Sequence, residues 1–267
     1  MSKRSTVRAC RQSEAAGFSP RSFTILDPFC GCGTAVAVAQ RLKRSWIGID
    51  ITHLAITLIK HRLHDAFGKS IKGTYHVVGE PVSLPDAKDL ASQDPYQFQF
   101  WALGLVGARP VDQKKGADQG IDGRLYFHDE KETTKTKQVI ISVKAGHVTS
   151  SFLRDLRGVV EREKAQIGVL ICMEDPTKPM RTEAASGGFY VSPAFMNEKA
   201  RFPLIQILTI EELLSGKTVA YPMASHGSAT FKRAELHQEE GGEVLSLPLG
   251  TPTASRDKNP SGAKKKR

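Results

Sequence analysis

The sequence predicts an α/β fold in two successive parts, and three patterns carry this prediction. A short apolar strand, a glycine-rich turn and a helix follow one another from Phe23 to Leu42. A hairpin pattern runs from Gly116 to Gly146, where two β-type runs flank a polar turn. Beyond it, an amphipathic helix over Ser151–Glu163 precedes a buried-type strand over Ile167–Cys172. Strands that alternate with helices in this way are typical of α/β proteins.

Composition predicts globular cores between two charged ends. The chain has 267 residues, and 40% of them are hydrophobic. Of the net charge of +10, residues 1–22 supply +4 (five Lys or Arg, one Glu) and residues 256–267 supply +5 (six Lys or Arg, one Asp). We therefore expect residues 1–22 and 222–267 to be disordered basic tails, which attract a phosphate backbone without reading its sequence.

The sequence also predicts where the protein resides. No apolar run approaches the roughly 20 residues that span a bilayer, and the basic N-terminus lacks the apolar stretch of a secretory signal. The four cysteines, Cys10, Cys30, Cys32 and Cys172, lack the paired spacing of a zinc site. We expect a cytoplasmic protein without structural disulfides and without a membrane partner.

The first part of the chain resembles a nucleotide-type loop. The strand Phe23–Leu26 ends at Asp27, glycines follow at Gly31 and Gly33, and a helix begins at Thr34. Glycines in such a turn let a ligand approach backbone N–H groups. A second strand ends at Asp50, close to the offset of about 20 residues at which an acid meets a ribose hydroxyl. Alternatively, the turn only connects a strand to a helix.

The elements that follow are predicted from hydrophobic periodicity and from the positions of turn and capping residues. A helix over His53–Phe67 has an apolar face, Tyr75–Val78 adds a strand, and Pro81–Asp94 is expected to be a linker. Later elements are expected at 95–106 (helix), 177–186 (helix), 204–208 (strand) and 210–214 (helix, capped by Thr209 and stopped by Gly216).

The hairpin contains the two residues from which we infer a reaction. Asp122 lies in a turn bounded by Gly120 and Gly123, and Lys144 ends an apolar strand. Antiparallel pairing would place the carboxylate and the ammonium at neighbouring strand ends, where a divalent metal and a scissile phosphate could be held together. The chemistry inferred from these residues is metal-assisted hydrolysis of a phosphodiester.

These motifs resemble two known families. GADQGIDG followed by a strand ending in SVK is similar to the Mrr-type branch of the PD-(D/E)XK restriction endonucleases, and DPFCGCGT with GID is similar to the N4/N6 amino-methylating DNA methyltransferases. From Asp27 to about Tyr221, the chain resembles bacterial fusions of the two. The resemblance implies a partial, mostly parallel Rossmann-like unit at 23–80, a linker at 81–94 and a mixed-sheet nuclease domain at 95–221, with helices on both faces.

For the methyltransferase part, the resemblance implies an S-adenosylmethionine site. Its residues would be Asp27, Phe29, Gly31, Gly33 and Thr34 in the loop, and Asp50 on the ribose. The family's catalytic (D/N/S)PP(Y/F/W) tetrapeptide does not occur in this sequence. We therefore expect a truncated fusion or one half of a split enzyme, which cannot methylate DNA alone.

For the nuclease part, the resemblance implies that Asp122 binds Mg²⁺ and that Asp118 contributes through water. Lys144 would stabilise charge in the transition state. Two departures from the family weaken the metal site: Ser142 stands at the acidic position of the (D/E/Q)xK motif, and Gln97 or Gln99 replaces a helix glutamate. Ser142 and Gln99 are expected to support the catalytic pair, with the Val143 carbonyl as a further oxygen ligand.

Three functions stay open at this point. The first is a Mg²⁺-dependent restriction-type endonuclease, the second a DNA-binding module that has lost cleavage, and the third a split methyltransferase subunit that supplies the S-adenosylmethionine loop. Expected partners are DNA and an upstream-encoded methyltransferase chain, and a homodimer is allowed. Glu161 is a weak substitute for the lost carboxylate, and His128 and His147 are expected to be loop residues.

Overall fold

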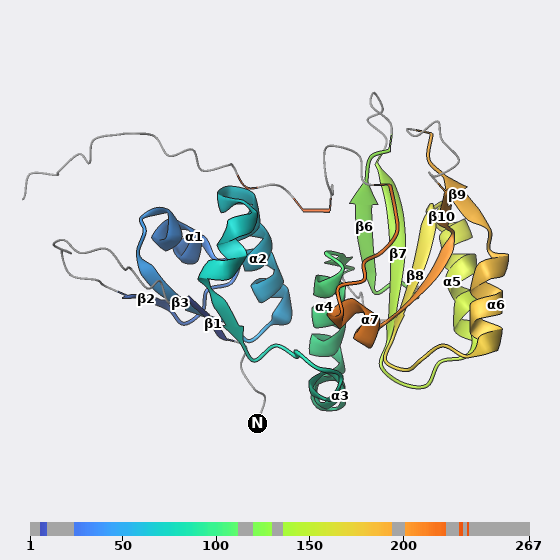
Figure 1. Ribbon diagram of the computed structural model, residues 1–267, viewed down its shortest axis with the longest axis horizontal. Helices are drawn as coiled ribbons and strands as arrows, with labels where there is room; N and C mark the ends of the chain where they lie inside the picture. The colour runs from blue at the N-terminus through green and yellow to red at the C-terminus, as the bar shows by residue number, and fades with distance from the viewer. Residues whose placement is uncertain are drawn as a thin grey trace, which may run out of the picture. The chain divides into compact units, whose positions relative to one another are not determined.

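The computed structural model describes residues 24–111, 120–129, 136–193, 201–222, 230–231 and 234, together with the backbone of residues 6–9. Figure 1 shows two larger sheets, one with strand order β2-β3-β1-β4 and one with order β11-β8-β7-β6-β5. No helix among the described residues is long and apolar enough to cross a membrane.

The four-stranded sheet contains one strand that the sequence did not predict. Strands β2, β3 and β4 run in one direction, and β1 runs opposite to them between β3 and β4. The expected disorder of residues 1–22 is therefore wrong for 6–9, and the other residues of that tail lie outside the described part. Two of the three strand pairings are antiparallel, so the sheet differs from the mostly parallel one that we expected. Three of its four strands nevertheless run in the same direction. The strands are β1 (Thr6–Ala9), β2 (Thr24–Asp27), β3 (Ser45–Ile49) and β4 (His76–Val78).

Two helices and a 3₁₀ turn accompany this sheet. The Thr52 side chain caps α2 by accepting a hydrogen bond from the Ala55 N–H at 3.2 Å, and Gly68 ends the helix. Ile56, Ile59 and other α2 residues pack with Trp46 of β3 in one apolar cluster. The bounds are α1 (Thr34–Arg41), α2 (His53–Phe67) and η1 (Lys69–Thr74).

The segment expected to be a linker forms a helix. Ser83 caps α3 (Leu84–Gln93), with Pro85 in its first turn, and Ala87 is fully buried in the apolar cluster of the second sheet. The Ser-Leu-Pro-Asp sequence is a helix start, and the prediction read its Ser and Pro as signs of a linker. Asp94 then caps α4 (Pro95–Leu105), which confirms the helix expected at this position.

The five-stranded sheet is mixed, as predicted. Strands β6 and β7 pair antiparallel, whereas β7, β8 and β11 pair in parallel. Strand β7 alternates between two cores, since Val139 and Ile141 pack with α4 and Ile140 packs with α5. The strands are β5 (Arg109–Pro110), β6 (Gly123–Phe127), β7 (Lys137–Lys144), β8 (Ile167–Cys172) and β11 (Ile205–Thr209).

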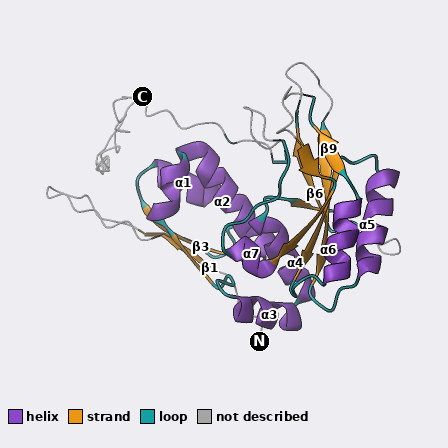
Figure 2. Ribbon diagram, turned by 45° about the vertical axis from the view of Figure 1, so that its right-hand side comes forward, coloured by secondary structure: helices purple, strands orange, loops and turns teal. Residues whose placement is uncertain are grey.

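Helices cover both faces of this sheet (Figure 2). Helices α5 (Ser150–Arg162) and α6 (Lys178–Ser186) bury their apolar residues against one face. The opposite face packs against α3, α4 and α7 (Ile210–Leu214). The core of this part is therefore a sheet between two helical layers, as the sequence predicts.

Two further features were not predicted. Strands β9 (Phe189–Val191) and β10 (Arg201–Pro203) form a separate antiparallel pair. In the tail expected to be disordered, Thr230 is buried and accepts a hydrogen bond from the Tyr126 N–H at 3.0 Å. The Thr230 hydroxyl thus satisfies a backbone N–H of β6. Most of residues 223–267 lie outside the described part.

Candidate functional site

Asp122 is fixed at the start of the β6–β7 hairpin by its backbone. Its N–H donates to the Ile141 carbonyl at 2.9 Å, and its own carbonyl accepts from the Val111 N–H at 3.2 Å. The residue is only 6% exposed. Backbone hydrogen bonds to Val111, just after β5, and to Ile141 of β7 therefore fix the position of Asp122.

The Asp122 carboxylate is surrounded by hydrogen-bond donors from the end of β7. Its Oδ2 accepts from the Val143 N–H at 2.7 Å and from the Ser142 hydroxyl at 3.2 Å. The Lys144 ammonium lies 3.8 Å from the same oxygen. The predicted juxtaposition of acid and lysine at neighbouring strand ends is thus present, with Ser142 beside them.

Lys144 is the accessible member of this group. Its side chain is 31% exposed, whereas the Asp122 side chain is 8% exposed. Its Nζ also lies 6.0 Å from the centre of the Phe152 ring on α5. The ammonium can therefore reach a phosphate at the surface while it remains paired with the buried carboxylate.

The two glutamines on α4 have different neighbours. Gln99 donates from Nε2 to the Asp122 carbonyl at 3.5 Å, which places it beside the predicted site. Gln97 instead accepts from the His53 N–H at 2.9 Å, at the start of α2. The candidate role of Gln97 as a metal ligand is therefore wrong, because residues two apart on a helix point to different sides.

The Mg²⁺ site that the sequence suggests around Asp122 stays a prediction. Mg²⁺ prefers oxygen ligands arranged octahedrally, with one or two carboxylates. The Asp122 carboxylate has a hydroxyl donor, an amide N–H and an ammonium among its neighbours. No three His, Cys, Asp or Glu side chains of the described residues gather as metal ligands. The predicted ligand Asp118 falls within residues 112–119, outside the described part.

The other candidate side chains lie elsewhere. Glu161 is exposed on α5 and pairs with Arg157 at 3.4 Å, and its role as a substitute carboxylate stays a prediction. His147 lies in the loop between β7 and α5, as expected, and is exposed. Its Nδ1 lies 3.2 Å from Glu174 Oε2. Arg162 pairs with Glu163 at 3.3 Å. A solvated helix face therefore accounts for these α5 charges.

In the glycine loop, Asp50 connects the turn to the next helix. Its Oδ2 accepts from the Gly31 N–H at 3.0 Å, and its Oδ1 accepts from the Thr52 N–H at 2.9 Å and hydroxyl at 2.8 Å. A sugar hydroxyl would have to share these oxygens. A cavity of about 570 Å³ begins at Ile51 and continues along Gly79 and Glu80.

The remaining loop residues divide between the turn and the surface. The Asp27 carboxylate accepts from the Phe29 N–H at 3.2 Å, and the Phe29 side chain is 86% exposed. The Thr34 hydroxyl accepts from Arg62 of α2 at 2.9 Å. A side chain at Gly31 would meet no atom within 4 Å, so there is open space beside this glycine. Five of the six predicted residues thus lie between the end of β2 and the start of α1, and Asp50 joins them through its hydrogen bond with the Gly31 N–H.

Gly33 has a structural role that can be tested. Its φ is +76°, and an added Cβ would lie 2.5 Å from Ile59 Cγ1 of α2. Gly33→Ala is therefore expected to lower the free energy of unfolding by about 1–3 kcal/mol through overpacking. Urea unfolding, followed by the fluorescence of Trp46 in a Trp101→Phe background, measures the loss.

The matched control for this substitution is Gly73→Ala, where an added Cβ would meet nothing within 4 Å. It should leave the urea midpoint nearly unchanged. Equal midpoints for Gly33→Ala and Gly73→Ala would show that α1 and α2 do not require a glycine at position 33.

Comparison with known proteins finds similarities in two parts of the chain. Residues 97–215 match the family model described as NACHT-associated inactive Restriction Endonuclease 1. Residues 18–61 match the N6/N4 model described as DNA methylase. The chain thus joins a DNA methylase-like region to a restriction endonuclease-like domain. No curated protein matches it. The solved structure of the MspJI restriction endonuclease in complex with a 27-mer oligonucleotide matches at 15% identity and a TM-score of 0.35, over 49% of this chain and 29% of that chain.

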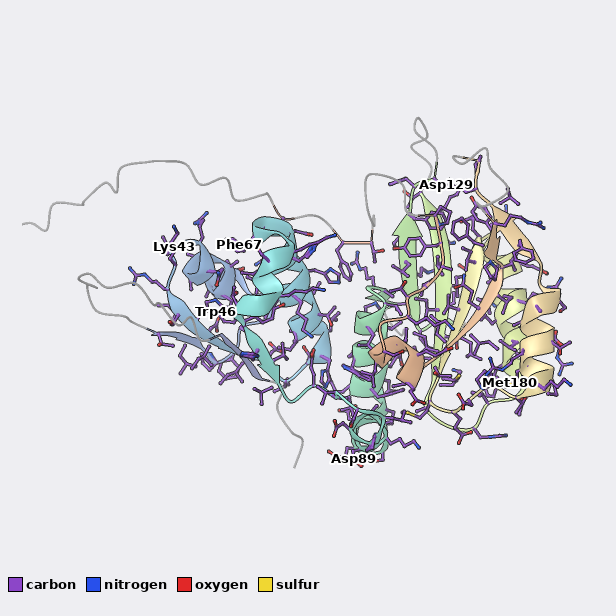
Figure 3. All side chains as sticks on the ribbon, viewed as in Figure 1. Lys43, Trp46, Phe67, Asp89, Asp129 and Met180 are labelled. Carbon is purple, nitrogen blue, oxygen red and sulfur yellow. The ribbon has the colours of Figure 1, made fainter. Side chains whose placement is uncertain are left out.

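The restriction endonuclease-like domain contains a second buried charge cluster, which sequence reasoning missed. Asp129 is 1% exposed at the loop end of the hairpin (Figure 3), and the Lys137 ammonium lies 2.8 Å from its Oδ1 and 3.0 Å from its Oδ2. Lys137 also donates to the Tyr190 hydroxyl at 2.9 Å, and Tyr190 donates to Asp129. The three side chains come from the loop after β6, from β7 and from β9, so no local sequence pattern identifies them.

Burial and hydrogen bonding set the protonation states in this cluster. Burial alone would lower the pKa of Lys137, but the hydrogen bonds to Asp129 and Tyr190 outweigh it and raise that pKa. Burial, together with the hydrogen bond that the Tyr190 hydroxyl donates to the Asp129 carboxylate, raises the pKa of Tyr190 to about 12. At neutral pH the cluster therefore holds a charged lysine and a neutral tyrosine.

A buried and a half-buried histidine of the methylase-like region, His53 and His61, make stability depend on pH. Burial lowers the pKa of both His53 and His61, partly offset by Glu80 near the first and Asp65 near the second. The unfolded chain therefore binds more protons below about pH 6.5. Stability is fully present above that pH and is lost as the pH falls through the lowered pKa values.

Thermal unfolding at pH 7.5 and at pH 5.5 measures this effect, and the melting temperature should fall at the lower pH. Because carboxylates also titrate near pH 5, the wild type is compared with the His53→Gln, His61→Gln double variant. The variant should show a smaller decrease. An identical decrease in both proteins would remove the two histidines as the cause.

Proposed function

We propose that the restriction endonuclease-like domain binds the phosphate backbone of DNA and has lost efficient cleavage. The observation that carries this proposal is the set of donors around Asp122: a hydroxyl, an N–H and an ammonium. A cleaving site of the resembled family would have a second acid where Ser142 stands. The match to an inactive restriction endonuclease model points the same way.

DNA as the ligand is supported by charge and by family. The chain carries a net charge of +10, and Lys144 presents a partly exposed ammonium at the strand end. Phosphate contacts of this kind give affinity without sequence specificity and weaken with salt. The GIDG and SVK motifs support the Mrr-type branch within the restriction endonucleases.

The test combines binding and cleavage on the same purified protein. Fluorescence anisotropy with a duplex oligonucleotide at two salt concentrations should show binding that weakens with salt. Lys144→Ala should reduce the salt slope by about one ion. In a plasmid nicking assay with Mg²⁺ or Mn²⁺, supercoiled DNA should stay intact. Absence of binding by folded protein would overturn the proposal.

Metal-dependent endonuclease activity is the second candidate, and the 3.8 Å approach of Lys144 to Asp122 favours it. Nicking that requires the metal, and that disappears in both Lys144→Ala and Asp122→Ala, would establish it in place of the first. Nicking that persists in both variants would come from a contaminating nuclease, so the nicking assay separates these three outcomes.

For the methylase-like region we propose S-adenosylmethionine binding, supported by Asp50, the open space beside Gly31 and the cavity that begins at Ile51. The ligand would supply a methyl group when bound, and the catalytic tetrapeptide of the resembled family does not occur in this sequence. Calorimetry with S-adenosylmethionine on the full chain tests binding alone. Asp50→Ala should abolish the heat, and no heat from the wild type would contradict the proposal.

A further inference from the structure

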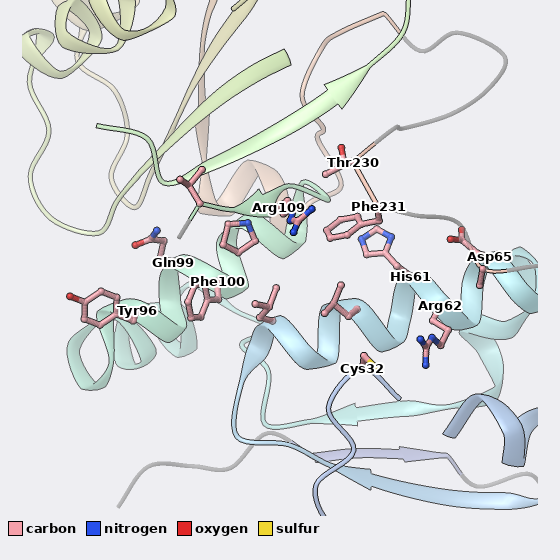
Figure 4. A pocket seen from close by; sticks show the side chains of 15 residues that line it. Cys32, His61, Arg62, Asp65, Tyr96, Gln99, Phe100, Arg109, Thr230 and Phe231 are labelled. Atoms are coloured by element: carbon pink, nitrogen blue, oxygen red, sulfur yellow. The ribbon is translucent and has the colours of Figure 1, made fainter. Parts of the chain in front are cut away.

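A cavity of about 750 Å³ lies beside α2 and is lined by groups that the proposed DNA-binding function does not use (Figure 4). Its walls come from one face of α2, from α4, from β5, from Phe231 and from Cys32 of the glycine loop. Pockets of about 300–1,000 Å³ commonly hold small molecules. The chemistry of the lining shows which class of molecule fits.

Aromatic rings form part of the lining. Phe100 and Tyr96 come from α4, and the His61 and Phe231 rings lie with their centres 4.6 Å apart and tilted by 32°. Burial lowers the pKa of His61, which keeps this imidazole neutral at pH 7. Planar π surfaces of this kind suit the stacking of a nucleic-acid base.

The charged groups of the lining favour an anion. Arg62 and Arg109 contribute two positive charges and Asp65 contributes one negative charge, so the lining is +1 with His61 neutral. Arg62 uses one N–H on the Thr34 hydroxyl at 2.9 Å, and a guanidinium has four more donors. In Figure 4, Arg62 and Asp65 lie on one side of the view and Phe100 on the other.

We propose that this cavity binds a nucleotide, a planar base with an attached phosphate. The base stacks on the aromatic groups, the arginines hold the phosphate, and the Asp65 carboxylate accepts from a sugar hydroxyl. The same chemistry is offered by a free mononucleotide and by an unstacked nucleotide of a single strand.

Such a ligand would contact both parts of the chain. Gln99 and Val111 line the cavity, and both donate hydrogen bonds to the Asp122 carbonyl, at 3.5 and 3.2 Å. Cys32 belongs to the glycine loop of the methylase-like region. The proposal does not depend on duplex binding by the restriction endonuclease-like domain, so either can fail alone.

Cys32 provides a direct readout. It is exposed, whereas Cys30 and Cys172 are buried, and burial raises the pKa of each of these two thiols to about 11. In a Cys10→Ser background, a fluorescent maleimide should therefore label Cys32 first. The labelling rate is measured with adenosine 5′-monophosphate, with a short single-stranded oligonucleotide and with inorganic phosphate.

Saturating nucleotide should slow the labelling of Cys32 at least fivefold. Protection by the mononucleotide indicates a free nucleotide, and protection by the oligonucleotide alone indicates a nucleotide of a strand. Equal protection by inorganic phosphate would reduce the cavity to an anion site and overturn the proposal. No protection by either nucleotide at millimolar concentration would also overturn it.

Two variants test the groups that would hold the ligand. Phe100→Ala and Arg109→Ala should each raise the half-protecting concentration about tenfold or more. Arg109 is exposed, so its variant should fold even if Phe100→Ala does not. The control Arg157→Ala removes an exposed arginine of α5, paired with Glu161 at 3.4 Å, and should change nothing. Unchanged protection in Arg109→Ala would contradict the proposed phosphate contact.

Discussion

The Ser142→Glu variant is expected to bind Mg²⁺ or Mn²⁺ far more tightly than the wild-type protein. The Ser142 hydroxyl donates to Asp122 Oδ2 at 3.2 Å in a site where both residues are 6% exposed. A glutamate there would put a second carboxylate beside the first, and like charges in a buried site repel unless a cation separates them. Metal binding should therefore be coupled to the stability of this variant.

Thermal unfolding with and without metal measures this coupling. In EDTA, Ser142→Glu should melt below Ser142→Gln, a control of equal size without the charge. Metal at about 100 times its dissociation constant should then stabilise the variant by about 2.7 kcal/mol, or roughly 5–10 °C. An equal metal-dependent shift in the wild type would show that Asp122 already binds the metal without a second acid.

Lys137→Met is expected to lower the free energy of unfolding of the restriction endonuclease-like domain by about 3–5 kcal/mol. The substitution keeps the aliphatic stem but removes an ammonium that lies 2.8 and 3.0 Å from the two Asp129 oxygens. Asp129, 1% exposed, would then be a buried charge that keeps a hydrogen bond from the Tyr190 hydroxyl but has lost its ammonium partner. The loss should exceed that of an exposed ion pair such as Arg157–Glu161.

The matched control is the double variant Asp129→Asn, Lys137→Met, in which the uncompensated charge is absent. It should lose less stability than Lys137→Met alone, because the cost arises from the unpaired carboxylate. The chain has two tryptophans, so a Trp46→Phe background leaves Trp101 of α4 as the reporter of this domain. A double variant as unstable as the single one would assign the loss to packing.

Local patterns predicted four strands of the five-stranded sheet and the pairing of Asp122 with Lys144, because these features lie within single strands and turns. The glycines around Asp122 mark the turn, and the apolar run before Lys144 marks the partner strand, so their juxtaposition follows from one hairpin. Gln97 and Gln99 are two residues apart on one helix, and only packing against α2 determined which of them faces Asp122.

Features that depend on distant pairing were missed. Strand β1 pairs with residues 46–49 and 76–78, and its four residues, with Val7 and Ala9 as the apolar ones, are too few to mark a strand by their own pattern. The cluster of Asp129, Lys137 and Tyr190 needs the β9 strand to return to the hairpin. Helix α3 was missed for a different reason, since its capping signal at Ser83 resembles the composition of a linker.

The position of β1 has a consequence for biosynthesis. Its two neighbours, β3 and β4, come later in the chain, and the second of them ends at Val78. On the ribosome, β1 can pair with β3 once residue 49 has emerged, but its other edge stays open until residue 78 has emerged and β4 can pair with it. A nascent chain halted before β4 would therefore display one edge of β1 to other chains as an unprotected strand edge.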